Sequence, residues 1–268
     1  MKLAIEARHH RLNPSLFPLE MMIEESIEFL RKNEPPEGYF VGFSGGKDSI
    51  VTERLCRMAG VKHRSFYSIT GIDPPETTVF IKREYPSVIR LKPPMSFWEG
   101  ILKKSPPLRR QRWCCDVLKK QPANPKVIKR LVGDPLRNRV MGIRAEESNK
   151  RASRPRIDKW KGIITFKPIF YWKEWHIWEF IDLYDLKYPC LYDEGFHRIG
   201  CIVCPYIVGP GVAAQKRIQR AKDRWPNTFN KFEKVVSEWF MARWKNSTRK
   251  QIQKTPEEYL EAYYRGFE

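Results

Sequence analysis

The sequence lacks several features that would place it in common protein classes. It contains no continuous apolar run of about 18 residues, which a membrane-spanning helix needs. Its first residues show no apolar segment followed by a small-residue cleavage site, so they do not indicate a secretory signal and we expect a cytoplasmic protein. With 6 cysteines in 268 residues it is too poor in cysteine for a disulfide scaffold, and clustered cysteines in such a protein indicate metal or redox chemistry.

Acidic residues are also scarce, because 31 Asp and Glu accompany 50 Lys and Arg and leave a net charge of +19. Residues 103–130 carry ten Lys or Arg with one acidic residue, and residues 209–254 carry twelve with three. Such an excess indicates a polyanionic partner or an anionic substrate. Aromatic residues lie between the basic ones of the second segment, as in many nucleic-acid-binding surfaces. A solvated basic surface without a partner is the alternative.

The order of apolar segments predicts an α/β fold with a parallel sheet. Helical periodicity covers residues 18–32. Four apolar segments have the length of buried strands, and helical segments lie between the first three: 39–43, 63–69, 87–91 and 138–143. This alternation is typical of βαβ units. Residues 163–166 are expected to form an edge strand.

The last third of the chain has a different composition. It is expected to contain an aromatic helix at 172–184, a loop rich in Cys, Gly and Pro at 186–210, and three further helices at 211–224, 228–242 and 256–265. We therefore predict two domains. Residues 1–170 would form a nucleotide-binding α/β domain, and residues 171–268 a cysteine-loop and basic helical region packed on it.

A glycine loop, Ser44-Gly45-Gly46-Lys47-Asp48-Ser49, lies between a predicted strand and a predicted helix. Glycines let backbone N–H groups approach phosphate oxygens, Ser hydroxyls donate hydrogen bonds, and the helix N-terminus adds partial positive charge. The loop is not a Walker A motif, because Val41 and Asp48 stand where that motif has Gly and Ser or Thr. The segment therefore predicts a phosphate-binding site.

The same segment, SGGKDS, resembles the pyrophosphate loop of the adenine nucleotide α-hydrolase superfamily, also called the PP-loop ATP pyrophosphatases. Members of this superfamily have a Rossmann-like α/β fold, cleave ATP between its α and β phosphates, and usually use Mg²⁺. The resemblance implies that Lys47 and Asp48 are catalytic residues. It also implies that the whole loop binds the pyrophosphate end of ATP: Ser44, Gly45, Gly46, Lys47, Asp48 and Ser49.

Two further segments resemble the sulfonucleotide (PAPS/APS) reductase branch of the superfamily. Residues 70–77, TGIDPPET, resemble its D-T-G-x-x-F-P-E-T element, although Ile69 stands in place of the first Asp. Residues 142–148, GIRAEES, resemble its G-[IL]-R-x-x-[ED]-S-x-x-R element. The two arginines of the second element suit bidentate phosphate binding, and ordinary surface arginines are the alternative. The resemblance thus adds four nucleotide-binding residues: Thr70, Gly71, Arg144 and Arg151.

Five cysteines are spaced in a way that also resembles this branch: Cys114, Cys115, Cys190, Cys201 and Cys204. A Cys-Cys pair with a later C-x-x-C resembles the signature that holds a [4Fe–4S] cluster in assimilatory APS reductases. Adjacent helical cysteines do not easily direct both sulfurs at one metal, so Cys190 is a fifth candidate for four ligand places. Structural Zn²⁺ is the alternative metal, since four thiolates suit either.

One element of the reductases is missing from the sequence. Their nucleophilic cysteine lies in a C-terminal E-C-G-[IL]-H element, and no cysteine follows Cys204 here. We therefore expect an iron–sulfur ATP pyrophosphatase that resembles those of DNA phosphorothioation systems and activates a nucleic-acid oxygen for sulfur insertion. Its partners would be ATP, DNA rather than tRNA, and a cysteine desulfurase or another sulfur donor. Two alternatives stay open: a reductase that releases sulfite from APS or PAPS, and a non-catalytic nucleic-acid-binding subunit.

Overall fold

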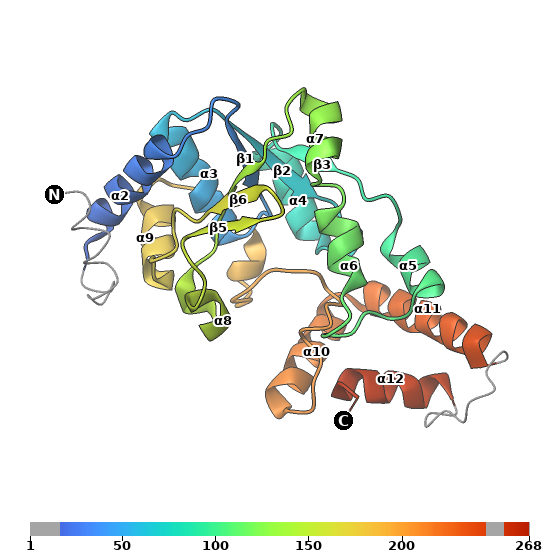
Figure 1. The fold of residues 1–268 in the computed structure, drawn as a ribbon. Coiled ribbons are helices and arrows are strands. Elements are labelled where there is room, and N and C mark those ends of the chain that lie inside the picture. The colour runs from blue at the N-terminus through green and yellow to red at the C-terminus, as the bar shows by residue number, and fades with distance from the viewer. Residues whose placement is uncertain (1–16, 245–254, 268) are drawn as a thin grey trace. The chain divides into compact units, whose positions relative to one another are not determined.

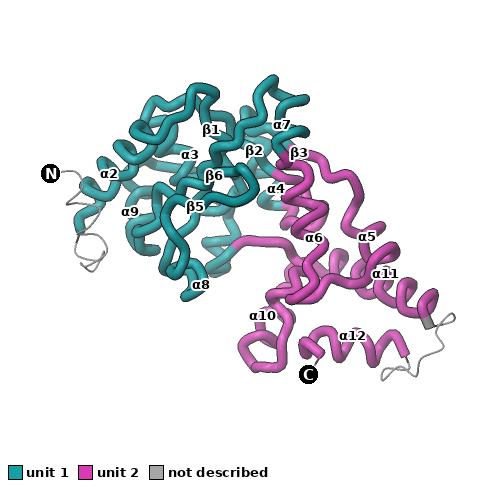
Figure 2. Tube along the Cα trace, viewed as in Figure 1, with its two compact units in different colours: residues 1–67, 76–90, 125–198 teal, residues 68–75, 91–124, 199–268 magenta. Residues whose placement is uncertain are grey.

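The computed structural model of the chain describes residues 17–244 and 255–267. The extreme N-terminus, on which the secretory prediction rests, and residues 245–254 of the second basic segment lie outside these ranges. The chain divides into two compact units, which Figure 2 colours separately. The expected domain boundary after residue 170 stays a prediction. Unit 1 comprises residues 1–67, 76–90 and 125–198, and unit 2 comprises residues 68–75, 91–124 and 199–268.

Unit 1 is built on a six-stranded sheet with the strand order β3-β2-β1-β4-β6-β5 (Figure 1). β1 pairs in parallel with β2 and β4, and β6 pairs in parallel with β4, whereas β5 is antiparallel to β6. This mostly parallel sheet with its helices confirms the predicted α/β fold class. The strands are β1 (Tyr39–Gly42), β2 (His63–Ser68), β3 (Ile89–Leu91), β4 (Asn138–Met141), β5 (Ile157–Trp160) and β6 (Ile163–Phe166).

Three helices of unit 1 share one apolar core with the sheet. Buried side chains of α2, α3 and α9 pack with those of β1, β4 and β6. Tyr39 and Val41 alternate into this core, while Phe40 points to the other face of the sheet and stacks on Phe66 at 4.4 Å between ring centroids. The helices of unit 1 are α2 (Leu19–Lys32), α3 (Lys47–Ala59), α4 (Pro75–Glu84), α7 (Pro125–Val132), α8 (Asn149–Ala152) and α9 (Glu174–Leu183).

The outer strands of the sheet correct one expectation. Residues 163–166 do form a strand, β6, but β6 lies between β4 and β5 and is not an edge strand. The edge strand on this side of the sheet is β5, which was not predicted because its four residues are mostly exposed and carry no apolar alternation. A tight turn joins the two strands, with Lys161 at a φ of 49° and Gly162 at 73°. Two consecutive positive φ angles are those of a type I′ hairpin turn.

Unit 2 is mostly helical in the ranges that the structure describes. Its core is separate from that of unit 1 and includes Phe97, Ile101, Leu118 and Phe232. The three C-terminal helices lie where they were expected, whereas α5 and α6 were not predicted. The helical elements are α5 (Phe97–Lys103), α6 (Trp113–Cys115), the π-turn η2 (Asp116–Lys120), α10 (Val212–Arg224), α11 (Pro226–Trp244) and α12 (Pro256–Arg265).

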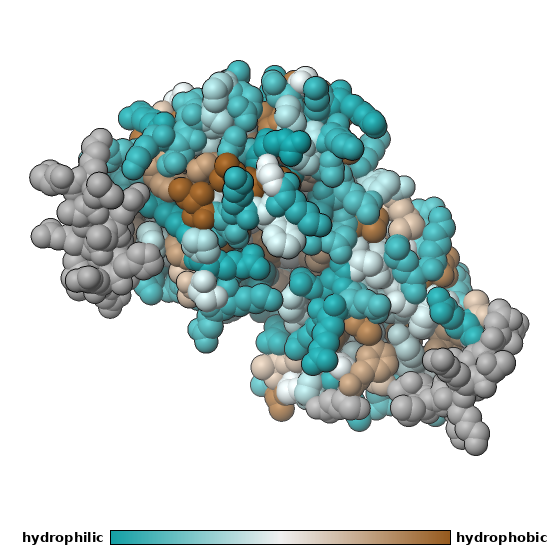
Figure 3. All heavy atoms as spheres, viewed as in Figure 1, coloured by the Kyte–Doolittle hydropathy of each residue, from teal (hydrophilic) through white to brown (hydrophobic). Residues whose placement is uncertain are grey.

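The surface of the molecule is polar on the side that Figure 3 shows, where hydrophilic residues surround scattered apolar ones. None of the helices within residues 17–244 and 255–267 combines the length and the apolar character that a bilayer-spanning segment needs.

A buried carboxylate connects α3 with the start of β2. Glu53 is 3% exposed, and its Oε1 lies 2.5 Å from Arg57 Nε and 3.9 Å from His63 Nε2. Burial by itself would raise the pKa of Glu53, but the interactions with His63 and Arg57 hold it below its ordinary value of 4.5. Burial would likewise lower the pKa of His63, but Glu53 and the carbonyl of Val61 raise it above 6.5.

We expect Glu53→Gln to lower the free energy of unfolding by about 1–3 kcal/mol near pH 6, because two cations lose a buried acceptor charge. The contribution of Glu53 is full above pH 4.5 and is lost as the pH falls through its lowered pKa. The contribution of His63 is full below pH 6.5 and is lost as the pH rises through its raised pKa. Urea unfolding across this range measures both slopes, and the Gln variant should show neither.

Glu84→Gln is the matched control for this experiment. Glu84 pairs with Arg83, whose side chain is 71% exposed, so its loss should cost less than about 1 kcal/mol. Equal losses of stability in the two variants near pH 6 would contradict the prediction.

Candidate functional site

The glycine loop between β1 and α3 takes its shape from two glycines. Gly45 has a φ of +75°, and a Cβ there would lie 2.8 Å from Ile81 Cδ1, so no larger residue fits. Gly46 is the N-cap residue of α3 and offers no side chain to its first N–H groups. The loop itself therefore leaves the start of α3 uncapped, which is the arrangement that binds anions.

Two serines hold the loop in this curved form. Ser49 Oγ donates to the carbonyl of Gly46 at 2.8 Å and accepts from Ser44 N at 3.2 Å. Gly46 N donates to Ser44 Oγ at 3.4 Å. The six predicted loop residues thus form one hydrogen-bonded turn, whose shape does not have to be created when a ligand binds.

Lys47 is the first residue of α3 and is 4% exposed. Its Nζ donates to the carbonyl of His197 at 3.0 Å and forms an ion pair with Glu174 Oε1 at 3.1 Å. The ammonium also lies 5.2 Å from the ring centroid of Tyr192 and 5.8 Å from that of Trp178. Burial would raise the pKa of Glu174, but the hydrogen bond and charge of Lys47 lower it below 4.5. The cation is therefore fixed in place beside the loop.

Asp48 joins the loop to the segment that follows β4. Its Oδ1 lies 2.6 Å from Arg144 Nε, and the Arg144 side chain is 4% exposed and also pairs with Glu146. Burial would lower the pKa of Arg144, but Asp48, Glu146 and Glu147 raise it. Two segments that were singled out separately in the sequence thus meet through a direct ion pair.

Arg151 lies in the same region but contacts the loop only through intermediates. Its guanidinium pairs with Glu147, and a carboxylate oxygen of Glu147 accepts a hydrogen bond from Arg144 N at 3.0 Å. With its side chain 31% exposed, Arg151 is the more accessible of the two predicted anion-binding arginines. Its role in nucleotide binding stays a prediction.

Thr70 and Gly71, which were also predicted to bind nucleotide, belong to unit 2. There Thr70 N donates to Asp73 Oδ2 at 3.3 Å, and Gly71 has a φ of +73°. Cys201 Sγ lies 3.9 Å from Thr70 Oγ1 and 3.7 Å from Asp73 Oδ1, and its single proton serves one of these oxygens at a time. The TGID turn is therefore a neighbour of the C-x-x-C segment.

Four of the five candidate ligand cysteines belong to unit 2. Cys114 and Cys115 share a hydrogen bond between their thiols. Cys201 and Cys204 also act on Cys114 through their charge, so the other three thiols of unit 2 lie within electrostatic reach of Cys114. Cys190 is exposed and lies in unit 1.

The acidity of these thiols differs strongly. The hydrogen bond from Cys114, aided by the charges of Lys119 and Arg112, lowers the pKa of Cys115 below its ordinary value. The same hydrogen bond, together with burial, raises the pKa of Cys114. Burial raises the pKa of Cys201 to about 12.

Lys119 lies within electrostatic reach of the thiols of Cys201 and Cys115. Burial would lower the pKa of Lys119, but the charges of Cys201, Asp73 and Cys115 raise it. Lys119 lies in the π-turn η2, in which Gln121 N donates to the carbonyl of Asp116 at 2.8 Å. This wider turn changes the direction of the side chains that follow the Cys-Cys pair.

The thiol set fits a [4Fe–4S] cluster or Zn²⁺ in donor chemistry. Among the residues that the structure describes, however, no group of three or more His, Cys, Asp or Glu side chains is arranged to hold a metal ion. The thiol of Cys114 is hydrogen-bonded to that of Cys115, and the thiol of Cys201 lies close to two oxygen acceptors. A metal would replace these thiol protons, so the donor chemistry of the residues suits a metal. The [4Fe–4S] cluster stays a prediction.

Three residues at these sites were not found by sequence reasoning: Glu174, Tyr192 and Lys119. The first two lie far along the chain from the loop and belong to no motif, so no local pattern reveals them. Lys119 was counted within a basic segment, because a run of cations does not distinguish a buried ammonium from a solvated one.

Comparison with known proteins identifies the family. Residues 38–207 match a model of the phosphoadenosine phosphosulfate reductase domain. The chain belongs to this family. The matched range contains the glycine loop, the GIRAEES segment and all five candidate ligand cysteines. This family is a branch of the adenine nucleotide α-hydrolase superfamily, which confirms the expected relationship, and its members are enzymes of that superfamily.

Individual relatives agree with this family. Two uncharacterized proteins of Methanocaldococcus jannaschii are 33% and 31% identical and match 74% and 72% of this chain, which spans less than half their length (41% and 46%). An adenosine 5′-phosphosulfate reductase of Burkholderia cepacia is 29% identical and covers 77% of this chain and 74% of its own. A crystal structure of Candida auris phosphoadenylyl-sulfate (PAPS) reductase in complex with phosphate shares the fold, with a TM-score of 0.51 at 18% identity, over 68% of this chain and 93% of that chain.

Proposed function

We propose that this chain is an iron–sulfur ATP pyrophosphatase that forms AMP and pyrophosphate and activates a nucleic-acid oxygen for replacement by sulfur. The observation that carries the proposal is the meeting of Lys47, Asp48 and Arg144 at the start of α3. A buried ammonium and a buried guanidinium at the N-terminus of α3 suit the negative charge that develops as pyrophosphate leaves.

In the proposed reaction, the substrate oxygen attacks the α-phosphorus of ATP. The bond from this phosphorus to the bridging oxygen of the β phosphate breaks, and pyrophosphate leaves with that oxygen and its electron pair. A sulfur nucleophile from a cysteine desulfurase or another sulfur donor then displaces the adenylated oxygen as AMP. Mg²⁺ that accompanies ATP would neutralise further charge, with Asp48 as the carboxylate of the loop.

Lys47 and Asp48 have distinct parts in this scheme. Lys47 is held by a carbonyl and a carboxylate, so its ammonium is already oriented when the nucleotide arrives. Asp48 positions Arg144 through the 2.6 Å contact with its Nε, which leaves Nη2 of the guanidinium for a phosphate oxygen. Glu174 offsets the charge of Lys47 until an anion takes its place.

The names of relatives favour a second candidate, the reduction of APS or PAPS with release of sulfite. Both candidates use the loop to hold phosphate groups, but they break different bonds. The pyrophosphatase breaks a phosphorus–oxygen bond of ATP, and the reductase separates sulfite from a sulfonucleotide. An assay of the products therefore distinguishes them.

The test is pyrophosphate release from ATP by the anaerobically purified full chain, with sulfite release from APS and PAPS measured in parallel. We expect Lys47→Gln to reduce pyrophosphate release by roughly 10²–10³-fold, since it removes a charge that stabilises the leaving group. Lys82→Gln, at an exposed position on α4, is the control and should behave as the wild type. Undiminished release by Lys47→Gln would overturn the assignment of the loop, and sulfite without pyrophosphate would favour the second candidate.

The ligands that we propose for the cluster are the four thiols of unit 2: Cys114, Cys115, Cys201 and Cys204. Membership of one compact unit supports this choice over a set that includes Cys190. Lys119 would balance part of the negative charge of a thiolate-bound cluster. The cluster itself would supply redox or sulfur-transfer chemistry.

We expect Cys201→Ser to lose most of the bound iron and the broad absorption near about 400 nm of a thiolate-bound cluster. Cys190→Ser and Cys56→Ser should retain both, because Cys190 lies in unit 1 and Cys56 is buried in its apolar core. Metal analysis and visible spectra of anaerobic samples measure the effect. Loss of iron in Cys190→Ser would contradict the ligand set, and zinc in place of iron would contradict the cluster.

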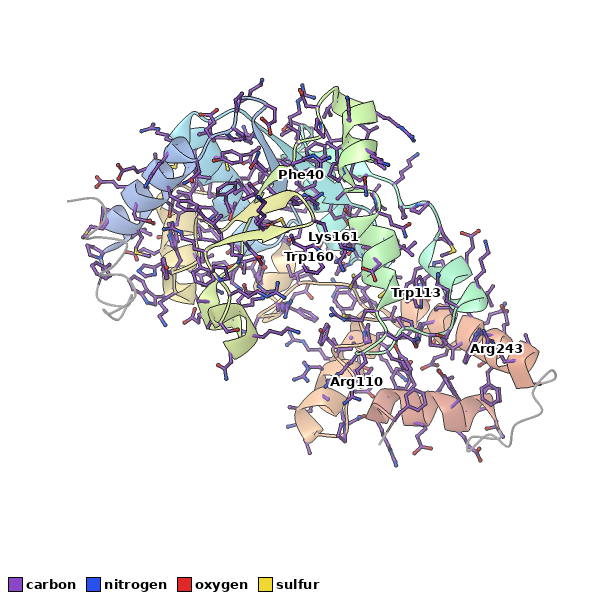
Figure 4. All side chains as sticks on the ribbon, in the orientation of Figure 1. Phe40, Arg110, Trp113, Trp160, Lys161 and Arg243 are labelled. Carbon is purple, nitrogen blue, oxygen red and sulfur yellow. The ribbon has the colours of Figure 1, made fainter. Side chains whose placement is uncertain are left out.

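The nucleic-acid part of the proposal is supported by the hairpin between β5 and β6. Trp160 is 71% exposed, and Lys161 Nζ lies 5.7 Å from the centroid of its ring (Figure 4). Arg137 lies at the same turn, since its Nη1 is 3.3 Å from the position of a Cβ on Gly162. An exposed indole on a turn that also carries two cations suits a stacked base whose phosphates meet the cations.

We expect Trp160→Ala to weaken the binding of single-stranded DNA to the full chain by about 5- to 100-fold, the equivalent of one stacked base. Trp160→Phe should keep most of the affinity. Trp175→Ala, which removes another partly exposed indole of unit 1, is the control. Fluorescence anisotropy with DNA and RNA oligonucleotides of one sequence measures the effect, and unchanged affinity in Trp160→Ala would contradict the prediction.

A further inference from the structure

A tyrosine that is 145 residues distant in the sequence closes the start of α3. Tyr192 lies in the 3₁₀ turn Cys190–Tyr192, and its hydroxyl oxygen accepts a hydrogen bond from Lys47 N at 3.0 Å. The same oxygen is 3.2 Å from the position of a Cβ on Gly46. The phenol thus occupies one of the backbone donors at which the glycine loop is expected to bind phosphate.

The phenol is held in place from several sides. The preceding residue, Leu191, is completely buried (0% exposed) and anchors the turn. The ring of Tyr192 packs edge-to-face on Trp178, with 5.2 Å between the centroids, and Lys47 Nζ lies over it at 5.2 Å. A side chain restrained in this way is a fixed wall of the site, because moving it would break an aromatic contact, a cation–π contact and a hydrogen bond together.

The direction of the hydroxyl proton follows from this hydrogen bond. The oxygen of Tyr192 uses a lone pair to accept from Lys47 N, so its own O–H must point elsewhere. Within residues 17–244 and 255–267, no acceptor is found for that proton. Burial raises the pKa of Tyr192 to about 12, so the hydroxyl keeps its proton at neutral pH. Tyr192 is only partly buried, so this proton is open to an acceptor that a ligand brings into the site.

We propose that Tyr192 is a binding residue of the site, which donates its hydroxyl proton to a non-bridging oxygen of the phosphate group held by the glycine loop. The proposal rests on the proposed function, because that function places the pyrophosphate end of a nucleotide at the loop. Tyr192 then adds one side-chain donor to the row of backbone donors. Its hydroxyl links Lys47 N to the ligand through two successive hydrogen bonds. The ligand class that it selects is a phosphate or diphosphate whose oxygens accept hydrogen bonds.

The experiment compares the binding of inorganic pyrophosphate to the full chain in the wild type, Tyr192→Phe and Tyr188→Phe. We expect Tyr192→Phe to raise the Kd roughly tenfold, the usual worth of a hydrogen bond to a charged group. Tyr188 is the matched control, because its ring lies 5.3 Å from that of Trp178 while its hydroxyl donates to Asp193 at 3.0 Å. Tyr188→Phe should change the Kd less than about twofold.

A second variant separates binding from folding. Gly46→Ala would place a Cβ 3.2 Å from the Tyr192 hydroxyl and push this hydroxyl aside by a few tenths of an ångström, without removing the tyrosine. Its effect on the Kd should be smaller in the Tyr192→Phe background than in the wild type, because the displaced hydroxyl is then already gone. Additive effects of the two changes would overturn the proposal even if Tyr192→Phe weakens binding by loss of stability.

The remaining outcomes also decide the question. Unchanged or tighter pyrophosphate binding by Tyr192→Phe, with normal binding by the wild type, would overturn the role of Tyr192 and show that its hydroxyl only caps an empty loop. The proposed function would then stand, since the wild type still binds the anion. A wild type that binds no pyrophosphate, like Lys47→Gln, would overturn both.

Discussion

The ion pair between Asp48 and Arg144 is the interaction on which the candidate site depends. It joins the segments that follow β1 and β4, which are neighbours in the parallel sheet. Gly142 makes this contact possible, because a Cβ there would lie 2.6 Å from the carbonyl oxygen of Asp48. Ligands of open α/β sheets bind at the carboxyl ends of the strands, so the pair stands where the fold itself provides a site. Removal of either partner would leave a poorly solvated charge, which links the stability of this edge to its function.

Local signals predicted most of unit 1 because its elements are long or strongly apolar. The strand, loop and helix that make up β1 to α3 follow one another directly, and each carries its own periodicity. β5 could not be predicted in this way, since Ile157 and Trp160 are 42% and 71% exposed and the strand exists through its pairing with β6. The missing strand also explains why β6 was taken for an edge. The capping box of Ser96 and Glu99 was the available signal for α5.

The residues of the candidate site also differ in whether a local sequence pattern predicts them. The glycine loop was found because its residues are contiguous and their chemistry is local. Arg144 was found through a second contiguous motif, although its contact with Asp48 spans 96 residues and only the sheet brings them together. Tyr192 and Glu174 complete the surroundings of Lys47 from two other elements, and neither the hydroxyl nor the carboxylate stands in a pattern that indicates this. A sequence pattern does not show that single residues from distant segments come together in the folded chain.

The chain passes several times between the two units, which limits how the protein can be divided into fragments. Unit 2 takes its residues from three separate stretches, 68–75, 91–124 and 199–268, and β2 and β3 each end just beyond a junction, at Ser68 and Leu91. No single backbone cut releases either unit, and a continuous fragment that holds all of unit 1 must also hold two of these stretches. Exchanging unit 2 for that of a relative would therefore require three grafts made together. Each graft would also have to preserve the end of a sheet strand or the segment that leads to the C-x-x-C residues.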